Sequence, residues 1–339
     1  MAHPRLDGGV NEVDWSLSRS KPDLNAISLG PILRLKITPY VMSLGYKLPA
    51  EMNTQAFWTQ MHLRASQMDI SYSKGSQIYE CFKAGGSYAI LCFPKHPLEI
   101  QVYIGLLSWI AILTDDQTSK SPEDFSLLGK RLLQGEKQPP GLATIWADLL
   151  LESYNYYDTY IANCIVYSSL DAVNACVLET RDENRNMVPT REGQSWPWYK
   201  RDKDGAGEAF ACLAFPKAMY PNMSLFMESL PDLAVYSALT NDILSFYKEE
   251  MEGETKSYVN SRALYENKSS LAVLTDIIEE SQQAYRRIEV ILNGREPYKL
   301  AAQDYVWGSV AFHMVNKRYR LGEIGLGIDD HYYMGVLIE

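Results

Sequence analysis

The chain has 339 residues, enough for a large hydrophobic core, and its 46% apolar and 22% charged residues are typical of a folded protein. Its formal net charge is −10, and Lys and Arg never run together for more than two residues, so we expect neither a nucleic-acid partner nor an anionic-membrane surface. An acidic protein can still bind an anionic substrate if metal ions supply the positive charge.

The cysteines and the N-terminal sequence favour a cytoplasmic protein. The cysteines form no Cys-x-x-Cys pair, and their odd number and apolar surroundings predict reduced core thiols. They are Cys81, Cys92, Cys164, Cys176 and Cys212. The N-terminus has no basic-then-apolar signal pattern, and no stretch approaches about 18 uninterrupted apolar residues, so we expect no membrane insertion.

The first third of the chain is expected to hold an arm and several helices. Residues 1–25 are polar and irregular and predict a loosely attached N-terminal arm. Helical patterning starts around Leu33 and returns over 54–69 and 72–83. Two glycines and two prolines then predict a break: Gly85, Gly86, Pro94 and Pro97.

Residues 98–118 are apolar on nearly every side, which predicts a central buried helix. This helix ends with Asp115 and Asp116. Two carboxylates conflict there with the helix dipole, which favours cations at a C-terminus. A bound cation would relieve the conflict; the alternative is an ordinary solvated helix end.

The middle of the chain predicts two further helical regions. A loop at 134–142 leads into a tyrosine-rich helix over 143–180, whose aromatic stripe we interpret mainly as core packing. Residues 181–195 are polar and predict an exposed loop. Helical patterning resumes at Trp196 and runs to Phe215.

A further helix carries a row of oxygen ligands. Asn241, Ser245 and Glu249 are spaced four residues apart, which stacks them on one helix face over about 12 Å. An amide oxygen, a hydroxyl and a carboxylate suit Mg²⁺, and Lys248 beside them could reach a phosphate. The alternative is a polar helix face with ordinary capping chemistry.

The last part of the chain predicts a polar linker over 252–270, an amphipathic helix over 271–292 and a final helix over 300–319. On the final helix four side chains are expected to share a face: Trp307, Ala311, Met314 and Arg318. Asp329-Asp330 are interpreted as a surface turn. The sequence contains no alternating strand pattern, so we expect an all-α, single-domain protein.

Together these motifs resemble class I terpene cyclases, and within them the trichodiene-synthase-like fungal sesquiterpene cyclases. The aspartate-rich motif of the family matches Asp115-Asp116, and its Asn-Asp-x-x-Ser-x-x-x-Glu motif matches Asn241, Asp242, Ser245 and Glu249. The family's basic Arg-Tyr pair matches Arg318-Tyr319, and Arg201 occupies the place of its diphosphate-sensing arginine. The resemblance covers about residues 100–320. One departure is Ser119, which stands where the family usually has a third acid.

The resemblance implies a helical terpenoid-synthase bundle over residues 26–339 around an apolar pocket. It implies Mg²⁺-dependent ionisation of farnesyl diphosphate, cyclisation to a sesquiterpene and release of diphosphate. Of three Mg²⁺ ions, two would be held by Asp115 in the aspartate-rich motif that includes Asp116, and the third by Asn241, Ser245 and Glu249. The implied diphosphate donors are Arg201, Lys248, Arg318 and Tyr319.

Three questions stay open at this point. Trp109 and Trp307 are our candidates for stabilising a carbocation, with core packing as the alternative for each. A chain-elongating prenyltransferase is the nearest rival, although it would carry a second aspartate-rich motif where Asn241 stands; a non-catalytic helical scaffold is the other. A homodimer is a candidate assembly.

Overall fold

The computed structural model describes residues 26–47 and 53–328, and within these ranges it contains helices and no strand, which confirms the all-α prediction. The predicted arm at 1–25 and the predicted turn at Asp329-Asp330 lie outside the described residues. The α-helices are α2 (Ala26–Ser43), α3 (Gln55–Ala65), α4 (Gln77–Cys92), α5 (Leu98–Thr118), α6 (Pro122–Ser126), α7 (Leu128–Gln134), α8 (Leu142–Tyr156), α9 (Thr159–Thr180), α10 (Asp182–Arg185), α11 (Trp196–Asp204), α12 (Gly207–Cys212), α13 (Leu230–Glu252), α14 (Tyr258–Glu266), α15 (Ser270–Ile291) and α16 (Tyr298–Val315). Short 3₁₀ turns are η1 (Met223–Leu225), η2 (Met227–Ser229), η3 (Lys317–Tyr319) and η4 (Leu321–Ile324).

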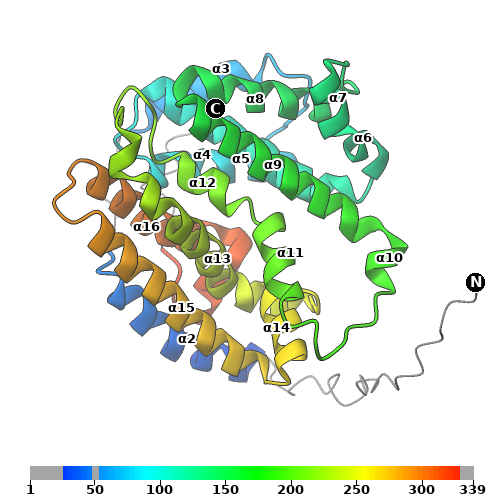
Figure 1. The fold of residues 1–339 in the computed structure, drawn as a ribbon, viewed down its shortest axis with the longest axis vertical. Coiled ribbons are helices and arrows are strands. Elements are labelled where there is room, and N and C mark those ends of the chain that lie inside the picture. Colours follow the sequence, from blue (N-terminus) through cyan, green and yellow to red (C-terminus); the bar gives the residue numbers. More distant parts are fainter. Residues whose placement is uncertain (1–25, 48–52, 329–339) are drawn as a thin grey trace, which may run out of the picture.

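Helix α13, which carries the row of oxygen ligands, lies in the middle of the bundle. Figure 1 shows it between α12 on one side and α15 with α2 on the other, and it also packs against α16. Its apolar residues, such as Leu233, Tyr236 and Ile243, are fully buried. The buried Tyr40 hydroxyl of α2 bonds to Thr240 of α13 at 2.7 Å and to Ser281 of α15 at 2.9 Å. These contacts fix three helices around one buried polar group.

Helix α4 runs through Gly85 and Gly86, so the break predicted at these glycines is wrong. A Cβ on Gly85 would lie 2.4 Å from the backbone nitrogen of Trp109, and one on Gly86 would lie 2.3 Å from the Trp58 ring. Gly85 therefore lets the backbones of α4 and α5 approach closely, because no side chain stands between them, and Gly86 leaves room for the Trp58 ring of α3. The chain leaves the helix only after Cys92, before the two prolines.

Helix α5 forms as predicted over 98–118 and packs against α3, α4 and α8. By length and composition alone, α5 and α9 could each cross a membrane, but 67% of the α5 window and 50% of the α9 window are buried inside the bundle. Burial of this extent is what core helices of a bundle show.

The single helix predicted over 143–180 is instead two helices, α8 and α9. The buried Tyr157 has an extended backbone, and its hydroxyl donates to the Leu213 carbonyl at 3.1 Å. Asp158 then caps α9 by accepting the Tyr160 backbone N–H at 2.8 Å. A buried tertiary hydrogen bond and a side-chain cap therefore interrupt a pattern that periodicity alone could not divide.

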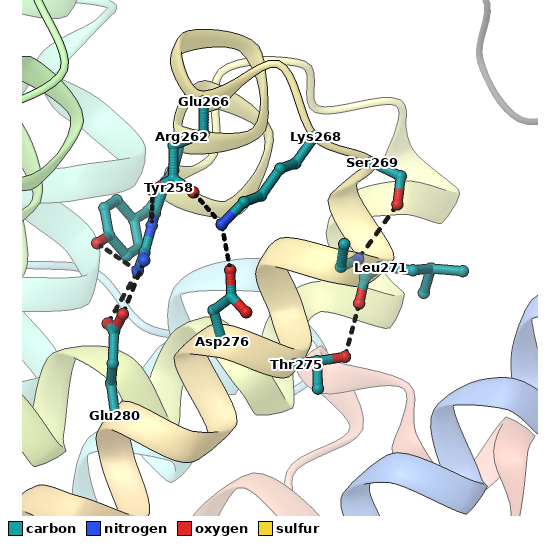
Figure 2. Close-up of polar contacts among 10 residues, drawn as sticks. Tyr258, Arg262, Glu266, Lys268, Ser269, Leu271, Thr275, Asp276 and Glu280 are labelled. Atoms are coloured by element: carbon teal, nitrogen blue, oxygen red, sulfur yellow. Dashed lines mark hydrogen bonds and ion pairs between the residues drawn. The ribbon is translucent and has the colours of Figure 1, made fainter.

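The stretch predicted as a polar linker contains α14, which packs onto α15 through charged groups (Figure 2). The Arg262 guanidinium forms two hydrogen bonds to the Glu280 carboxylate, at 2.7 and 2.8 Å. Lys268 bonds to Asp276 of α15 at 2.8 Å, and Ser269 caps α15 by accepting the Ala272 N–H. The buried apolar residues of this nine-residue helix are Tyr258, Val259 and Ala263, a pattern too short for the sequence to indicate a helix.

Candidate active site

The end of α5 and the segment after α16 meet through an ion pair. Helix α16 ends at Val315, and the Asn316 side chain accepts the Arg318 backbone N–H at 3.2 Å. This turn directs Arg318 to Asp116, with Nη2 at 3.1 Å from Oδ1 and Nη1 at 3.4 Å from Oδ2. The prediction that Arg318 shares a helical face with Trp307 is therefore wrong, because the helix ends before Arg318.

The two acids at the end of α5 have different partners. Asp115 Oδ1 accepts from the Cys176 thiol of α9 at 3.6 Å, whereas Asp116 Oδ2 accepts from the Cys81 thiol of α4 at 3.7 Å. Asp115 is exposed at the end of α5, and desolvation by the surrounding protein together with the neighbouring Asp116 carboxylate raises its pKa. Ser119 is the exposed C-terminal cap of the helix. The acidic pair therefore faces two directions, as consecutive helical residues must.

Ser245 and Glu249 lie one turn apart on α13, and the Ser245 hydroxyl donates to Oε1 of Glu249. The other carboxylate oxygen, Oε2, is buried and has no hydrogen-bond partner among the described residues. Burial raises the pKa of Glu249 to about 7. A buried carboxylate oxygen without a partner is costly, and a cation would satisfy it.

Asn241, one turn before Ser245, is held from two sides. Its Oδ1 accepts from Nη2 of Arg201 at 3.2 Å, and its Nδ2 lies 3.2 Å from Nε2 of His313. His313 is buried on α16, its Nδ1 lies 2.7 Å from the Ser309 carbonyl oxygen, and burial lowers its pKa to about 4. The amide of Asn241 therefore has a defined orientation.

Arg201 is buried at the end of α11 and is committed to protein acceptors. Its Nε donates to Asp242 at 2.9 Å, Nη1 to Asp204 at 3.0 Å and Nη2 to the Ala238 carbonyl at 2.9 Å. Burial opposes its charge, but Asp242 and Asp204 outweigh burial and raise the pKa of Arg201. Here the helix predicted over 196–215 divides into α11 and α12, because Ala206 adopts a left-handed backbone with φ of 45°.

Tyr319 connects the two ends of the site. It is buried, and its ring centroid lies 4.2 Å from that of His313. Burial raises the pKa of Tyr319; Arg318 opposes the shift, and the charges of Glu249 and Asp115 add to it. The phenol therefore lies within electrostatic range of both acidic motifs, which are far apart in sequence.

The remaining predicted site residues, Lys248, Trp109 and Trp307, each contact a neighbouring protein group. Lys248 lies 3.5 Å from Glu252 on its own helix. The fully buried Trp109 donates to the Ile78 carbonyl at 3.2 Å and packs edge-on against Phe82. Trp307 donates to the Leu44 carbonyl at 2.9 Å. Both tryptophans make packing contacts, and for each a role in stabilising a carbocation stays a prediction.

The structure also brings in residues that the sequence did not indicate. They are Cys81, Cys176, Asp204, His313 and an aromatic group made of Tyr88, Phe210 and Phe312. The sequence could have indicated Asp204 as a partner of Arg201, since it follows Arg201 by three residues and falls on the same helix face. His313 gave a weaker indication, because it is the polar residue in the apolar stretch from Val310 to Val315 that ends α16.

The residues fit a hard divalent cation. No group of three His, Cys, Asp or Glu side chains gathers as a metal site within the described part of the chain. The donors on α13 are instead one carboxylate, one hydroxyl and one amide oxygen, and such oxygen donors suit Mg²⁺. A pocket of about 250 Å³ opens beside the Asp116–Arg318 pair, between α4 and the end of α16.

An all-α bundle that gathers an acidic helix end, an Asn-Ser-Glu row and an Arg-Tyr pair around one region defines a terpene synthase. The comparison of the sequence with known families agrees, since the family model Trichodiene synthase (TRI5) matches residues 59–331. The chain belongs to the trichodiene synthase family and is a terpene cyclase.

Known relatives and solved structures are similar over most of the chain. Longiborneol synthase CLM1 of Gibberella zeae is 34% identical over 266 residues, which cover 78% of each chain. Terpene synthase BipA of Cochliobolus sativus is 32% identical over 299 residues, which cover 86% of this chain and 90% of BipA. The crystal structure of linalool/nerolidol synthase from Streptomyces clavuligerus in complex with 2-fluorogeranyl diphosphate superposes with a TM-score of 0.61, 13% identity and coverage of 78% and 100%. This last similarity supports the fold.

Proposed function

We propose that the enzyme converts farnesyl diphosphate into a cyclic sesquiterpene and diphosphate in an Mg²⁺-dependent reaction. The observation that carries the proposal is the buried Oε2 of Glu249, unpartnered among the described residues, on the same helix face as Ser245 and Asn241. A second acidic position, Asp115, acts electrostatically on Tyr319, as Glu249 does. An anionic substrate bridged by cations would satisfy both acidic positions together.

Three ions are part of the proposal, two at Asp115 beside Asp116 and one at Asn241, Ser245 and Glu249. When bound, Mg²⁺ supplies Lewis-acid stabilisation of the charge that develops on the leaving diphosphate. The chain's own donors do the rest of the binding. Arg318 has a planar fork that suits a diphosphate oxygen pair, and it exchanges Asp116 for the substrate. The Tyr319 phenol and the Lys248 ammonium add donors nearby.

The reaction begins when the allylic carbon–oxygen bond breaks and the bonding electron pair leaves with diphosphate. The remaining carbocation requires surroundings that are dry and do not react with it. Tyr88, Phe210 and Phe312 supply aromatic faces, since the Tyr88 ring centroid lies 5.0 Å from that of Phe210 and 5.1 Å from that of Phe312. Phe312 in turn lies 5.6 Å from Tyr319. Each aromatic face can stabilise a cation by about 0.5–2 kcal/mol. Loss of a proton or capture of water then ends the reaction.

We also propose the cytoplasm as the compartment, which the five free thiols of the described chain support. The substrate assay separates the candidates. Purified protein is incubated with Mg²⁺ and with prenyl diphosphates of ten, fifteen and twenty carbons, followed by gas chromatography–mass spectrometry. A cyclic product from the fifteen-carbon substrate supports the proposal. Product from another chain length only, chain elongation with an added five-carbon unit, or equal activity in excess chelator contradicts it.

A further inference from the structure

Two contacts of the Asn241 side chain determine where its amide protons lie. Arg201 Nη2 lies 3.2 Å from Oδ1, and guanidinium nitrogens only donate hydrogen bonds, so this atom of Asn241 must be the acceptor. The amide nitrogen Nδ2 is then the atom that faces Nε2 of His313 at 3.2 Å. The reversed amide would place two donors against each other at Arg201.

The tautomer of His313 follows from the same logic. Its Nδ1 lies 2.7 Å from the Ser309 carbonyl oxygen, which only accepts, so Nδ1 carries the proton. Nε2 must then offer its lone pair to Nδ2 of Asn241. Arg201 thus donates to the oxygen of the Asn241 amide, and His313 accepts from its nitrogen.

We propose that His313 is a positioning residue for the reaction: its unprotonated Nε2 holds the Asn241 amide so that Oδ1 faces the metal and diphosphate region. This role rests on the proposed function, because Asn241 is a candidate Mg²⁺ ligand there. Oδ1 has two lone pairs, so it can accept from Arg201 and still bind a cation. His313 contributes no atom to the metal or the substrate.

The surroundings of His313 keep its ring from turning. The side chain is 4% exposed, and its ring lies 4.2 Å from that of Tyr319 and 5.2 Å from that of Phe312. An outer residue of this kind fixes the orientation of a metal ligand, and its loss typically weakens metal binding by about 10–100-fold. His313 also joins the Asn-Ser-Glu helix to the segment that carries Arg318 and Tyr319.

The test compares His313→Gln with His313→Asn. The Gln amide can reach Asn241 and offer an oxygen in place of Nε2, whereas the shorter Asn amide leaves Nδ2 of Asn241 without an acceptor. The readout is Mg²⁺ binding in the presence of inorganic diphosphate, measured by isothermal titration calorimetry. We expect His313→Asn to lose about 10–100-fold in affinity and His313→Gln to stay close to wild type. If His313→Asn fails to fold, His313→Phe keeps a packed ring without the acceptor and should show the same loss.

Two controls separate positioning from general damage. His96 is also buried, and its Nε2 contacts the Leu213 carbonyl at 3.0 Å, so His96→Asn should affect stability and leave Mg²⁺ affinity unchanged. In an Asn241→Asp background the amide is absent, so His313→Asn should have little further effect on binding.

Each outcome decides the question. Equal losses in His313→Gln and His313→Asn, or wild-type binding by His313→Asn, would overturn the role of His313 while the proposed function stands. Failure of the wild-type protein to bind Mg²⁺ with diphosphate would instead overturn the proposed function.

Discussion

Arg318 and Asp116 are 202 residues apart in the sequence and form an ion pair with Nη2 and Oδ1 at 3.1 Å. The pair joins the turn after α16 to the acidic end of α5, and a pocket opens beside it. It therefore brings an anion-binding donor and a candidate metal ligand to the same place before any substrate arrives.

Arg318→Lys tests the planar fork of this arginine. Lysine keeps the positive charge but cannot make two parallel hydrogen bonds to a carboxylate or a diphosphate. We expect slower turnover, by about 10²-fold, and a larger share of linear or early-quenched products. Steady-state kinetics with product analysis by gas chromatography–mass spectrometry measure both. Wild-type turnover with an unchanged product profile would remove Arg318 from the site.

The acids at the end of α5 should differ in their contributions. Asp115→Asn removes the carboxylate that we propose as an Mg²⁺ ligand and whose charge helps to raise the pKa of Tyr319. We expect a loss of about 10²–10³-fold or more in kcat. Asp116→Asn should be milder because Asn can still accept from Arg318, and Ser119→Ala milder still because the Ser119 hydroxyl at the helix C-cap carries no charge. Kinetics at saturating Mg²⁺ give the ranking. A Ser119→Ala variant as impaired as Asp115→Asn would contradict this ligand assignment.

Mg²⁺ binding should depend on pH through Glu249. Its pKa is raised from 4.5 to about 7, chiefly by burial, so the folded metal-free protein favours the protonated carboxyl. The buried protonated carboxyl of Glu249 therefore contributes most to the free energy of unfolding below pH 4.5. This contribution is lost as the pH rises through about 7 and the carboxyl ionises. The metal needs the carboxylate, so Mg²⁺ affinity should rise toward pH 7 and level off above it.

Titration calorimetry across this pH range measures the affinity, and urea unfolding of the metal-free protein measures the stability. Each pH unit within the range is worth up to about 1.4 kcal/mol. Glu249→Gln is the control, because it removes the Glu249 carboxyl and should remove the part of both profiles that this carboxyl contributes, while the raised pKa of the buried Asp242 still affects stability. A wild-type profile identical to that of Glu249→Gln would show that another group controls metal binding.

Gly85→Ala tests the close approach of α4 and α5. The added methyl would lie 2.4 Å from the Trp109 backbone nitrogen, and backbone cannot move aside cheaply. We expect a loss of about 1–3 kcal/mol in the free energy of unfolding. Gly129→Ala in α7 is the matched control, since a Cβ there meets no atom within 4 Å and should stabilise by about 0.5–1 kcal/mol. Equal effects in urea unfolding would mean that the α4–α5 contact tolerates a side chain.

The sequence alone determined the helical class, the boundaries of α5 and the row of Asn241, Ser245 and Glu249. These features are local: apolar periodicity predicts a helix, and a spacing of four residues places side chains on one face whatever surrounds them. The motif order was also enough to indicate the family before any contact was known.

The tertiary structure decided which residues face one another. Only the turn at Asn316 directs Arg318 to Asp116, and only the packing of α16 against α13 brings His313 to Asn241. The same holds for Gly85, which suggested a break in sequence but serves contact between helices, because the atoms that exclude a side chain belong to α5. Contacts between distant segments depend on the packing of the whole bundle, and no local pattern encodes them.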